Sequence, residues 1–212
     1  MERIVIYGAG GMGRETALLV NDINANCPTY ELVGYSVDED YYADEMEVGG
    51  YKVYSRRWLV EHKDDVLCAC AIGYPKERRE VMKRLRNEGV RFATLVHPVA
   101  HVAEIDKVGE GSVIAGYALV SEGVTLGCGV FLNSMVIIGH DCNIGDYVSC
   151  FPKAQISGGC RIGEAVSIGA MSYIHEKKTI GDESVVAPGS IVLRNVKPRA
   201  HAMGNPAKMY SL

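Results

Sequence analysis

The sequence contains little that would assign it to a membrane-bound or nucleic-acid-binding class. No apolar run approaches the roughly 20 residues that a membrane-spanning helix needs. Lysine and arginine together number 22 against 26 aspartates and glutamates, which gives a net charge of −4, and no basic stripe is present. We therefore expect neither a membrane nor a nucleic acid as a partner.

The number of cysteines does not indicate a disulfide framework. The seven cysteines are an odd number, and the first residues, MERIVIYGAG, enter a strand pattern without signal-peptide features. We expect reduced thiols in a cytoplasmic protein. Cys142 and Cys160 lie 18 residues apart, where a disulfide is sterically conceivable, but the same reasoning favours two core thiols.

A period of six residues runs through the second half of the chain. A small or branched side chain also follows each repeat position by four residues, from Ser112 to Ser172, until Lys178 breaks the pattern. Every position of the period is aliphatic except Cys150: Val102, Val108, Ile114, Val120, Leu126, Leu132, Ile138, Ile144, Cys150, Ile156, Ile162, Ile168, Ile174, Ile180, Val186 and Val192.

This period indicates strands rather than helices. Six is a multiple of two, so each segment can be a short strand with an inward face, whereas a period of 3.6 or 3.5 would spread the aliphatic residues around a helix. Glycine recurs directly after the aliphatic position, where the chain must bend tightly. Three such segments form a triangular coil of about 18 residues, and stacked coils about 4.8 Å apart build a prism around a column of Ile and Val.

The first hundred residues alternate between strand and helix patterns. Residues 3–7 predict a strand, residues 8–13 a glycine loop, and residues 16–23 a helix; a second strand ends at Asp38. DVLCACAIG predicts a third strand, and PKERREVMKRLRNEG predicts a helix with a proline near its start and a glycine at its end. A small parallel sheet with helices on its faces follows. The expected domains are residues 1–97, a nucleotide-sugar-binding α/β unit resembling half of a Rossmann fold, and residues 98–212, the prism with a C-terminal tail.

The glycine loop predicts a nucleotide site. Its backbone N–H groups can approach phosphate oxygens at a helix N-terminus, and Asp38 is the acidic residue that closes the second strand. The α/β unit has only half the strands of a dinucleotide fold, so a single nucleotide or a nucleotide-sugar fits better. The expected substrate-binding residues of this unit are Gly8, Gly10, Gly11, Gly13 and Asp38.

Six motifs in this order resemble one family: YGAGGMGRE, AIG at residues 71–73, LVHP at 95–98, LNS at 132–134, GHDCNIGDY, and GNPAKM at 204–209. The chain resembles the hexapeptide-repeat acyltransferases, and among them the sugar O-acyltransferases of the sialic acid O-acetyltransferase type, whose near relatives N-acetylate nucleotide-linked amino sugars. The resemblance implies a left-handed parallel β-helix, although general crossover rules favour the right hand. It also implies acetyl-CoA as co-substrate and a homotrimer with active sites between subunits.

His140 and Asp141 stand at a corner of the prism, where a small residue would be ordinary. A neutral imidazole suits removal of a proton from an attacking amine or hydroxyl, and a neighbouring carboxylate can hold its tautomer. In the family, a histidine followed by an acidic residue in this motif is the general base with its orienting partner. We therefore expect His140 as base and Asp141 as partner, with direct attack on the thioester because no activated nucleophile is evident.

Further site residues follow from the resemblance and the register. Asn133 matches an asparagine that the family places near the sugar, and Ser149 stands where the family often has a second histidine close to the thioester. The coenzyme A groove is expected along Gly158, Ala170 and Pro188, and Lys208 in GNPAKM is expected near a coenzyme phosphate.

A metal site is not expected. Zinc needs three or four converging ligands, and the repeats offer only His140 and His175 besides His101 at their start. His140 and His175 are 35 residues apart, one short of two coils, so they do not stack in register.

Three functions remain open from the sequence: N-acetylation of an amino sugar nucleotide, O-acetylation of a sugar such as sialic acid, and non-catalytic binding of a sugar nucleotide or a scaffold role. The base that the first two need is the same, so the residues do not separate them. The His140–Asp141 pair argues against the third.

Overall fold

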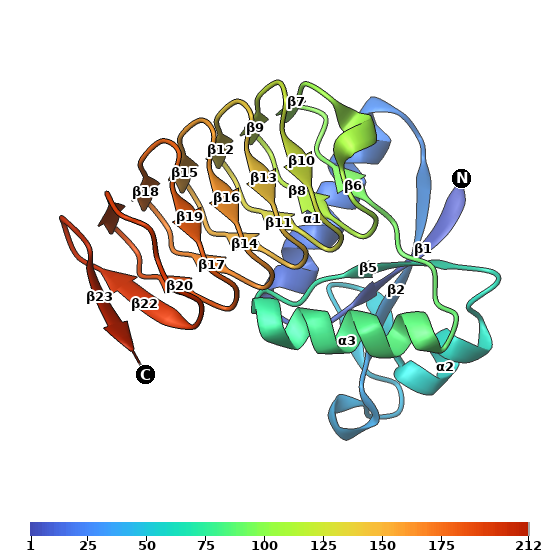
Figure 1. The fold of residues 1–212 in the computed structure, drawn as a ribbon. Coiled ribbons are helices and arrows are strands. Elements are labelled where there is room, and N and C mark those ends of the chain that lie inside the picture. Colours follow the sequence, from blue (N-terminus) through green and yellow to red (C-terminus); the bar gives the residue numbers. More distant parts are fainter. Residues whose placement is uncertain (212) are drawn as a thin grey trace.

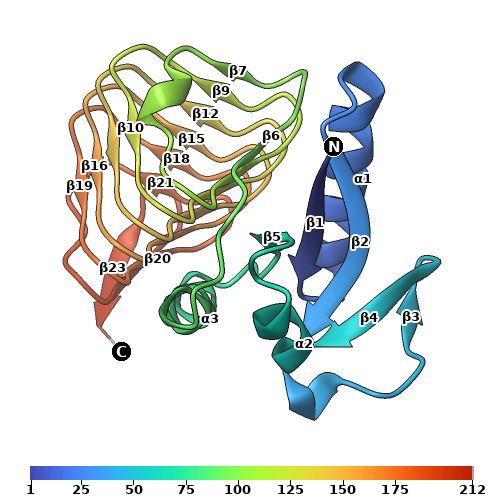
Figure 2. The ribbon, with the colours of Figure 1, turned by 90° about the vertical axis from the view of Figure 1, so that its right-hand side faces the viewer.

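The computed structural model describes residues 1–211 as an α/β unit packed against a triangular β-helix (Figures 1 and 2). The α/β unit contains a five-stranded sheet of order β3-β4-β2-β1-β5, parallel except for the β3–β4 hairpin. Its elements are β1 (Glu2–Tyr7), α1 (Gly11–Asn26), β2 (Tyr30–Val37), η1 (Glu39–Tyr41), β3 (Glu47–Val48), β4 (Tyr51–Ser55), α2 (Arg56–Glu61), β5 (Leu67–Cys70) and α3 (Pro75–Asn87).

Alternation along β1 explains how this sheet is covered. Ile4 and Ile6 pack in a cluster that includes α1, whereas Val5 and Tyr7 pack in a cluster that includes α2 and α3. The expected strands and both expected helices are present. The hairpin and α2 come from a segment to which no element was assigned; Ser55 begins α2 by accepting a hydrogen bond from the Trp58 N–H at 3.2 Å.

The second half is the left-handed β-helix, with three faces built mostly of two-residue strands. Face 1 comprises β6 (Leu95–Val96), β8 (Val113–Ile114), β11 (Phe131–Leu132), β14 (Ser149–Cys150), β17 (Ser167–Ile168), β20 (Val185–Val186), β22 (Ala200–Met203) and β23 (Lys208–Ser211). Face 2 comprises β7 (His101–Val102), β9 (Leu119–Val120), β12 (Ile137–Ile138), β15 (Gln155–Ile156), β18 (Tyr173–Ile174) and β21 (Ile191–Val192). Face 3 comprises β10 (Thr125–Leu126), β13 (Asn143–Ile144), β16 (Arg161–Ile162) and β19 (Thr179–Ile180), with η2 (Ile105–Lys107) preceding it in the chain.

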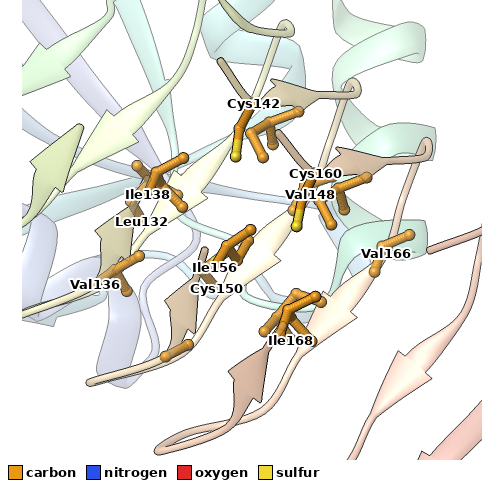
Figure 3. Packing of buried hydrophobic residues seen from close by; sticks show 14 of the residues in the cluster. Leu132, Val136, Ile138, Cys142, Val148, Cys150, Ile156, Cys160, Val166 and Ile168 are labelled. Carbon is orange, nitrogen blue, oxygen red and sulfur yellow. The ribbon is translucent and has the colours of Figure 1, made fainter. Parts of the chain in front are cut away.

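The strand register is the one that the period of six predicts. Leu132 pairs with Cys150, and Cys150 with Ile168, so stacked residues are 18 apart. The second residue of the two-residue strands points inward: Ile138, Cys150 and Ile156 are all fully buried. Figure 3 shows these side chains stacked with Cys142 and Cys160, both of which are free thiols.

The recurrent glycines are explained by close stacking rather than by the bend itself. A Cβ on Gly139 would lie 2.6 Å from the backbone nitrogen of Gly158 in the next coil. The left-handed backbone conformation instead falls two residues further on, as at Asp141 with φ 58°. The glycine therefore leaves room for the neighbouring coil, and the following turn supplies the corner.

The α/β unit covers face 1 of the column. Val113 and Phe131, which point outward from face 1, belong to the cluster beneath α1, while Tyr147 and Ala165 pack with α3. In Figure 2, α3 lies between the sheet and the column. Because β6 already pairs with β8, the column begins at the junction itself. The boundary at residues 97 and 98 stays a prediction. No helix within residues 1–211 has the length and apolar character to cross a membrane.

Candidate active site

His140 and Asp141 form an exposed pair at the corner between faces 2 and 3. His140 Nδ1 lies 2.8 Å from Asp141 Oδ2, and the two side chains are 73% and 74% exposed. If Nδ1 carries the proton donated to Asp141, Nε2 keeps a lone pair. Within residues 1–211, Nε2 has no hydrogen-bond partner. This ring nitrogen can therefore accept a proton from a bound molecule.

Gly158, one coil further along, lies against this imidazole. A Cβ on Gly158 would come within 2.5 Å of His140 Nε2. The absent side chain thus leaves space for the ring at its observed position. The structure brings together two residues that the sequence assigned to different roles, the base and the coenzyme groove.

Asp141 has a local reason to be at this corner as well as a chemical one. Its φ of 58° lies in the left-handed region, which aspartate tolerates better than most residues. The turn that fixes its backbone also places its carboxylate against His140, so that one residue meets both demands.

A cavity of about 400 Å³ lies at the carboxyl ends of β1 and β2, where α/β sheets bind ligands. Gly8, Gly10 and Asp38, three of the expected substrate-binding residues, line it. Gly11 begins α1, and Gly13 packs so closely that a Cβ would lie 2.0 Å from the Gly8 carbonyl oxygen. The complete lining is Tyr7, Gly8, Ala9, Gly10, Val37, Asp38, Tyr41, Met46, Ile72 and Val81.

Asp38 is held by cations that sequence reasoning did not identify. Arg84 on α3 approaches Asp38 Oδ1 to 2.6 Å, and Arg56 Nε lies 3.6 Å away. Arg84 also donates to the Tyr7 hydroxyl at 3.0 Å. Burial, followed by the nearby Asp38 carboxylate, raises the pKa of Tyr7. The wall of this cavity therefore combines a neutral phenol with a fixed carboxylate.

A second cavity, of about 330 Å³, separates α1 from the corner between faces 1 and 2. Asn133 lines it together with Met12 and Glu15. Its wall also contains a second imidazole–carboxylate pair, in which His97 Nε2 lies 3.0 Å from Asp22 Oδ2. Sequence reasoning did not identify this pair, because the two residues are 75 positions apart in the chain.

Ser149, which is expected as an acetyl-CoA contact, lies in the interior of the structure. Ser149 is 0% exposed, and its hydroxyl donates a 2.7 Å hydrogen bond to the Gly73 carbonyl. Its side chain points outward from face 1, but the α/β unit covers this face and separates the side chain from solvent.

The remaining predicted groove residues are distributed over different parts of the column. Ala170 and the exposed Pro188 occupy the corner between faces 1 and 2, whereas His140 and Gly158 occupy the corner between faces 2 and 3. Lys208 lines a separate cavity of about 440 Å³ with Arg194 near the end of the column. One chain therefore does not gather the predicted base, sugar contact and groove residues at one place.

No three or more His, Cys, Asp or Glu side chains converge on a metal-sized space in the described residues 1–211.

Comparison with known proteins agrees with the fold and the motifs. The family model of the PglD N-terminal domain matches residues 3–85. The GDP-perosamine N-acetyltransferase of Escherichia coli O157:H7 is 30% identical over 174 residues, which cover 81% of this chain and 77% of that one. A UDP-N-acetylglucosamine O-acyltransferase that uses acyl carrier protein, from Burkholderia thailandensis, is 33% identical over 88 residues, 42% of this chain and 34% of that one.

Two solved structures have the same architecture over nearly the whole chain. The acetyltransferase domain of PglB from Neisseria gonorrhoeae, in complex with acetyl coenzyme A, is 27% identical and superposes with a TM-score of 0.86, covering 99% of both chains. PerB from Caulobacter crescentus, in complex with CoA and GDP-perosamine, is 23% identical with a TM-score of 0.84, covering 99% of this chain and 98% of that one. At 23% identity, the similarity to PerB supports the shared fold alone.

The fold and the match to named acyltransferases identify the class of the protein as an acyltransferase. The chain belongs to the hexapeptide-repeat sugar acyltransferases, a family that also contains the GDP-perosamine N-acetyltransferase of Escherichia coli O157:H7.

Proposed function

We propose that the protein transfers the acetyl group of acetyl-CoA to the amine of a nucleotide-linked amino sugar, with His140 as general base. The observation that carries the residue assignment is the open Nε2 of an imidazole whose Nδ1 is held by Asp141 at 2.8 Å. The amine forms a bond to the thioester carbonyl carbon, and Nε2 takes its proton. Collapse of the tetrahedral intermediate breaks the C–S bond, and coenzyme A leaves as the thiol after protonation.

The two cavities beside α1 suggest how the acceptor is held. The nucleotide occupies the cavity between Gly8 and Asp38, and its diphosphate crosses the glycine loop at the N-terminus of α1. The sugar then extends into the second cavity beside Asn133. Residues 1–97 thereby act as the acceptor-binding domain, and residues 98–212 supply the base and the coenzyme groove.

We further propose that the site is completed by a neighbouring subunit in a homotrimer. Within one chain, Asn133 and His140 lie at different corners of the column, so a second copy is needed to bring a base to the sugar. An apolar strip supports the association, because exposed hydrophobic groups on a column favour contact with another copy. This strip consists of Tyr117, Leu119, Met135, Ile137 and Met171, from face 2 and its corner with face 1.

Mixed oligomers test the shared site. His140→Ala and Asp38→Ala chains should each be inactive when pure, and a refolded mixture should regain activity because some interfaces then combine an intact base with an intact nucleotide pocket. If the mixture stays as inactive as its components, the site lies within one chain.

The acceptor is tested with a panel of UDP-, GDP- and dTDP-linked amino sugars and acetyl-CoA, following thiol release. We expect one amino sugar nucleotide to be acetylated and its counterpart with a hydroxyl in place of the amine to be inert. Turnover of the hydroxyl sugar, or of free sialic acid, would favour O-acetylation. Failure to bind any acyl-CoA would favour a binding or scaffold role. A cytoplasmic location belongs to the same proposal, supported by the seven free thiols.

A further inference from the structure

Arg78, on α3, is a buried cation without a carboxylate partner in the described part of the chain. It is 1% exposed. Its five N–H groups each meet a backbone carbonyl: Nε donates to Gly129, Nη1 to Ile72 and Gly73, and Nη2 to Tyr147 and Val148, at distances from 2.7 to 3.1 Å. Burial lowers the pKa of Arg78 to about 10, so the guanidinium is still charged at neutral pH.

The five carbonyls come from two separate parts of the fold. Gly129, Tyr147 and Val148 belong to the column, while Ile72 and Gly73 belong to the segment that follows β5. Ser149 donates to the same Gly73 carbonyl at 2.7 Å. Arg78 and Ser149 therefore tie residues 71–74, which we call the pocket loop, to the column.

The pocket loop lies against the predicted nucleotide site. Ile72 lines the cavity that contains Gly8 and Asp38. A Cβ on Gly8 would lie 3.0 Å from the Ala71 carbonyl oxygen, and one on Gly73 would lie 3.4 Å from Met12 Sδ. A shift of this loop would therefore disturb both the glycine loop and the start of α1.

The carbonyl contacts also fix the direction of two donors. In a trans peptide the N–H points opposite to the C=O. Because the carbonyls of Ile72 and Gly73 point at Arg78, the N–H groups of Gly73 and Tyr74 point away from it. Neither N–H donates to a protein acceptor within residues 1–211. Successive free N–H groups of this kind suit phosphate oxygens.

We infer that Arg78 and Ser149 are positioning residues that hold the pocket loop so that its free N–H groups meet the diphosphate of the nucleotide-linked substrate. The inference rests on the proposed function, because it takes the adjoining cavity as the nucleotide site. A purely mechanical link between α3 and the column could be apolar, since apolar replacement of buried ionic groups is often neutral or stabilising. A buried guanidinium instead orients five carbonyl dipoles at once.

Binding measurements separate this role from simple support. Calorimetry with UDP, GDP and dTDP identifies which diphosphate the wild type binds, and the matching nucleoside without phosphates is the second ligand. We expect Ser149→Ala to weaken diphosphate binding about three- to tenfold, the effect of one lost hydrogen bond. Arg78→Lys should weaken it more, because a lysine cannot reproduce the planar set of donors. Binding of the nucleoside and of coenzyme A should change less than twofold.

Ser167→Ala is the matched control. Ser167 pairs with Ser149 in the next coil of face 1, and its hydroxyl makes no hydrogen bond to the described residues. The Ser167→Ala variant should bind the diphosphate with the same affinity as the wild type. Arg78→Lys is compared with the wild type only after circular dichroism shows that this variant has the native fold. If Arg78→Lys does not fold, the binding data for Ser149→Ala alone test the inference.

The outcomes are distinguishable. If the wild type binds a diphosphate but folded Ser149→Ala and Arg78→Lys bind it equally well, the inference is overturned and the proposed function stands. Equal weakening of the diphosphate, the nucleoside and coenzyme A would show general support and also overturn it. If the wild type binds none of the three diphosphates, the proposed function fails and the inference fails with it.

Discussion

Two imidazole–carboxylate pairs within residues 1–211 differ in whether the second ring nitrogen is free. His140 uses only Nδ1 for Asp141, and its ring is largely exposed. His97 uses both nitrogens: Nε2 lies 3.0 Å from Asp22 Oδ2, and Nδ1 accepts the Val99 N–H at 3.2 Å. His140 can accept a proton from a substrate, whereas both ring nitrogens of His97 already have hydrogen-bond partners within the protein.

The surroundings of the two rings show the same division. His97 is 18% exposed and has Gly116 at its face, where a Cβ would lie 3.4 Å from the ring. It links α1 to the junction with the column, beside Asn133 in the second cavity. The difference teaches that an imidazole with a carboxylate partner is a candidate base only when its second nitrogen is free.

The largest expected effect is the loss of the free nitrogen. His140→Ala should lower kcat by about 10²–10⁴-fold, the usual contribution of a general base, while oligomeric state and Tm stay unchanged. His97→Ala should lower Tm and reduce kcat less than tenfold. Steady-state thiol release and thermal unfolding of both variants provide the comparison. A reversed order of the two kcat losses would assign the base to His97.

The next effect concerns the partner carboxylates. Asp141→Asn should lower kcat about 10- to 100-fold, because an amide can hold the imidazole in the wrong tautomer. The loss should not be larger, because solvent weakens the interaction between the exposed side chains of His140 and Asp141. Asp22→Asn, the matched change, should leave kcat within about twofold. Equal kcat values for Asp141→Asn and the wild type would reduce Asp141 to a corner residue chosen for its left-handed backbone.

A smaller and more selective effect is expected at Gly158. A methyl group there would meet the His140 ring at 2.5 Å, and an exposed side chain can rotate away at little cost. Gly158→Ala should therefore lower kcat about tenfold by misplacing the base and leave the urea midpoint unchanged. A loss of stability with full activity in the remaining folded protein would contradict this account.

The smallest effect concerns the ion pairs that join α3 to the column. Arg79 and then Lys76 hold the pKa of Glu183 below its ordinary value of 4.5. A carboxylate with a lowered folded-state pKa stabilises the fold above its unfolded-state pKa, and this contribution is lost as the pH falls through the lowered value. Urea unfolding at pH 7 should show Glu183→Gln slightly less stable than the wild type, and the difference should shrink as the pH falls below 4.5. A difference that persists in acid would exclude the ionic origin.

Local regularity made much of the fold predictable. The strands and helices around the glycine loop follow from alternation and from end signals such as Pro75 and Gly89. The hairpin was missed although Gly49 and Gly50, both with positive φ, form a two-residue glycine turn of the kind that joins hairpin strands. The helix α2 was missed because it is only 6 residues long. The reason for the column's glycines was also misjudged: their need for small size comes from the neighbouring coil, 18 residues away, rather than from their own turn.

The sequence by itself determined the column, its register and the His140–Asp141 pair, because these depend on residues repeated at a short period or adjacent in the chain. Only the tertiary structure decided that Ser149 is sealed against Gly73, that Arg84 holds Asp38, that His97 meets Asp22, and that Arg78 joins the pocket loop to the column. The contact between Arg84 and Asp38 forms inside the α/β unit, between α3 and the end of β2. The other three depend on the packing of the α/β unit against the column. A side chain's place in a repeat fixes the direction in which it points, but the surface that meets it there is set by how the two units dock.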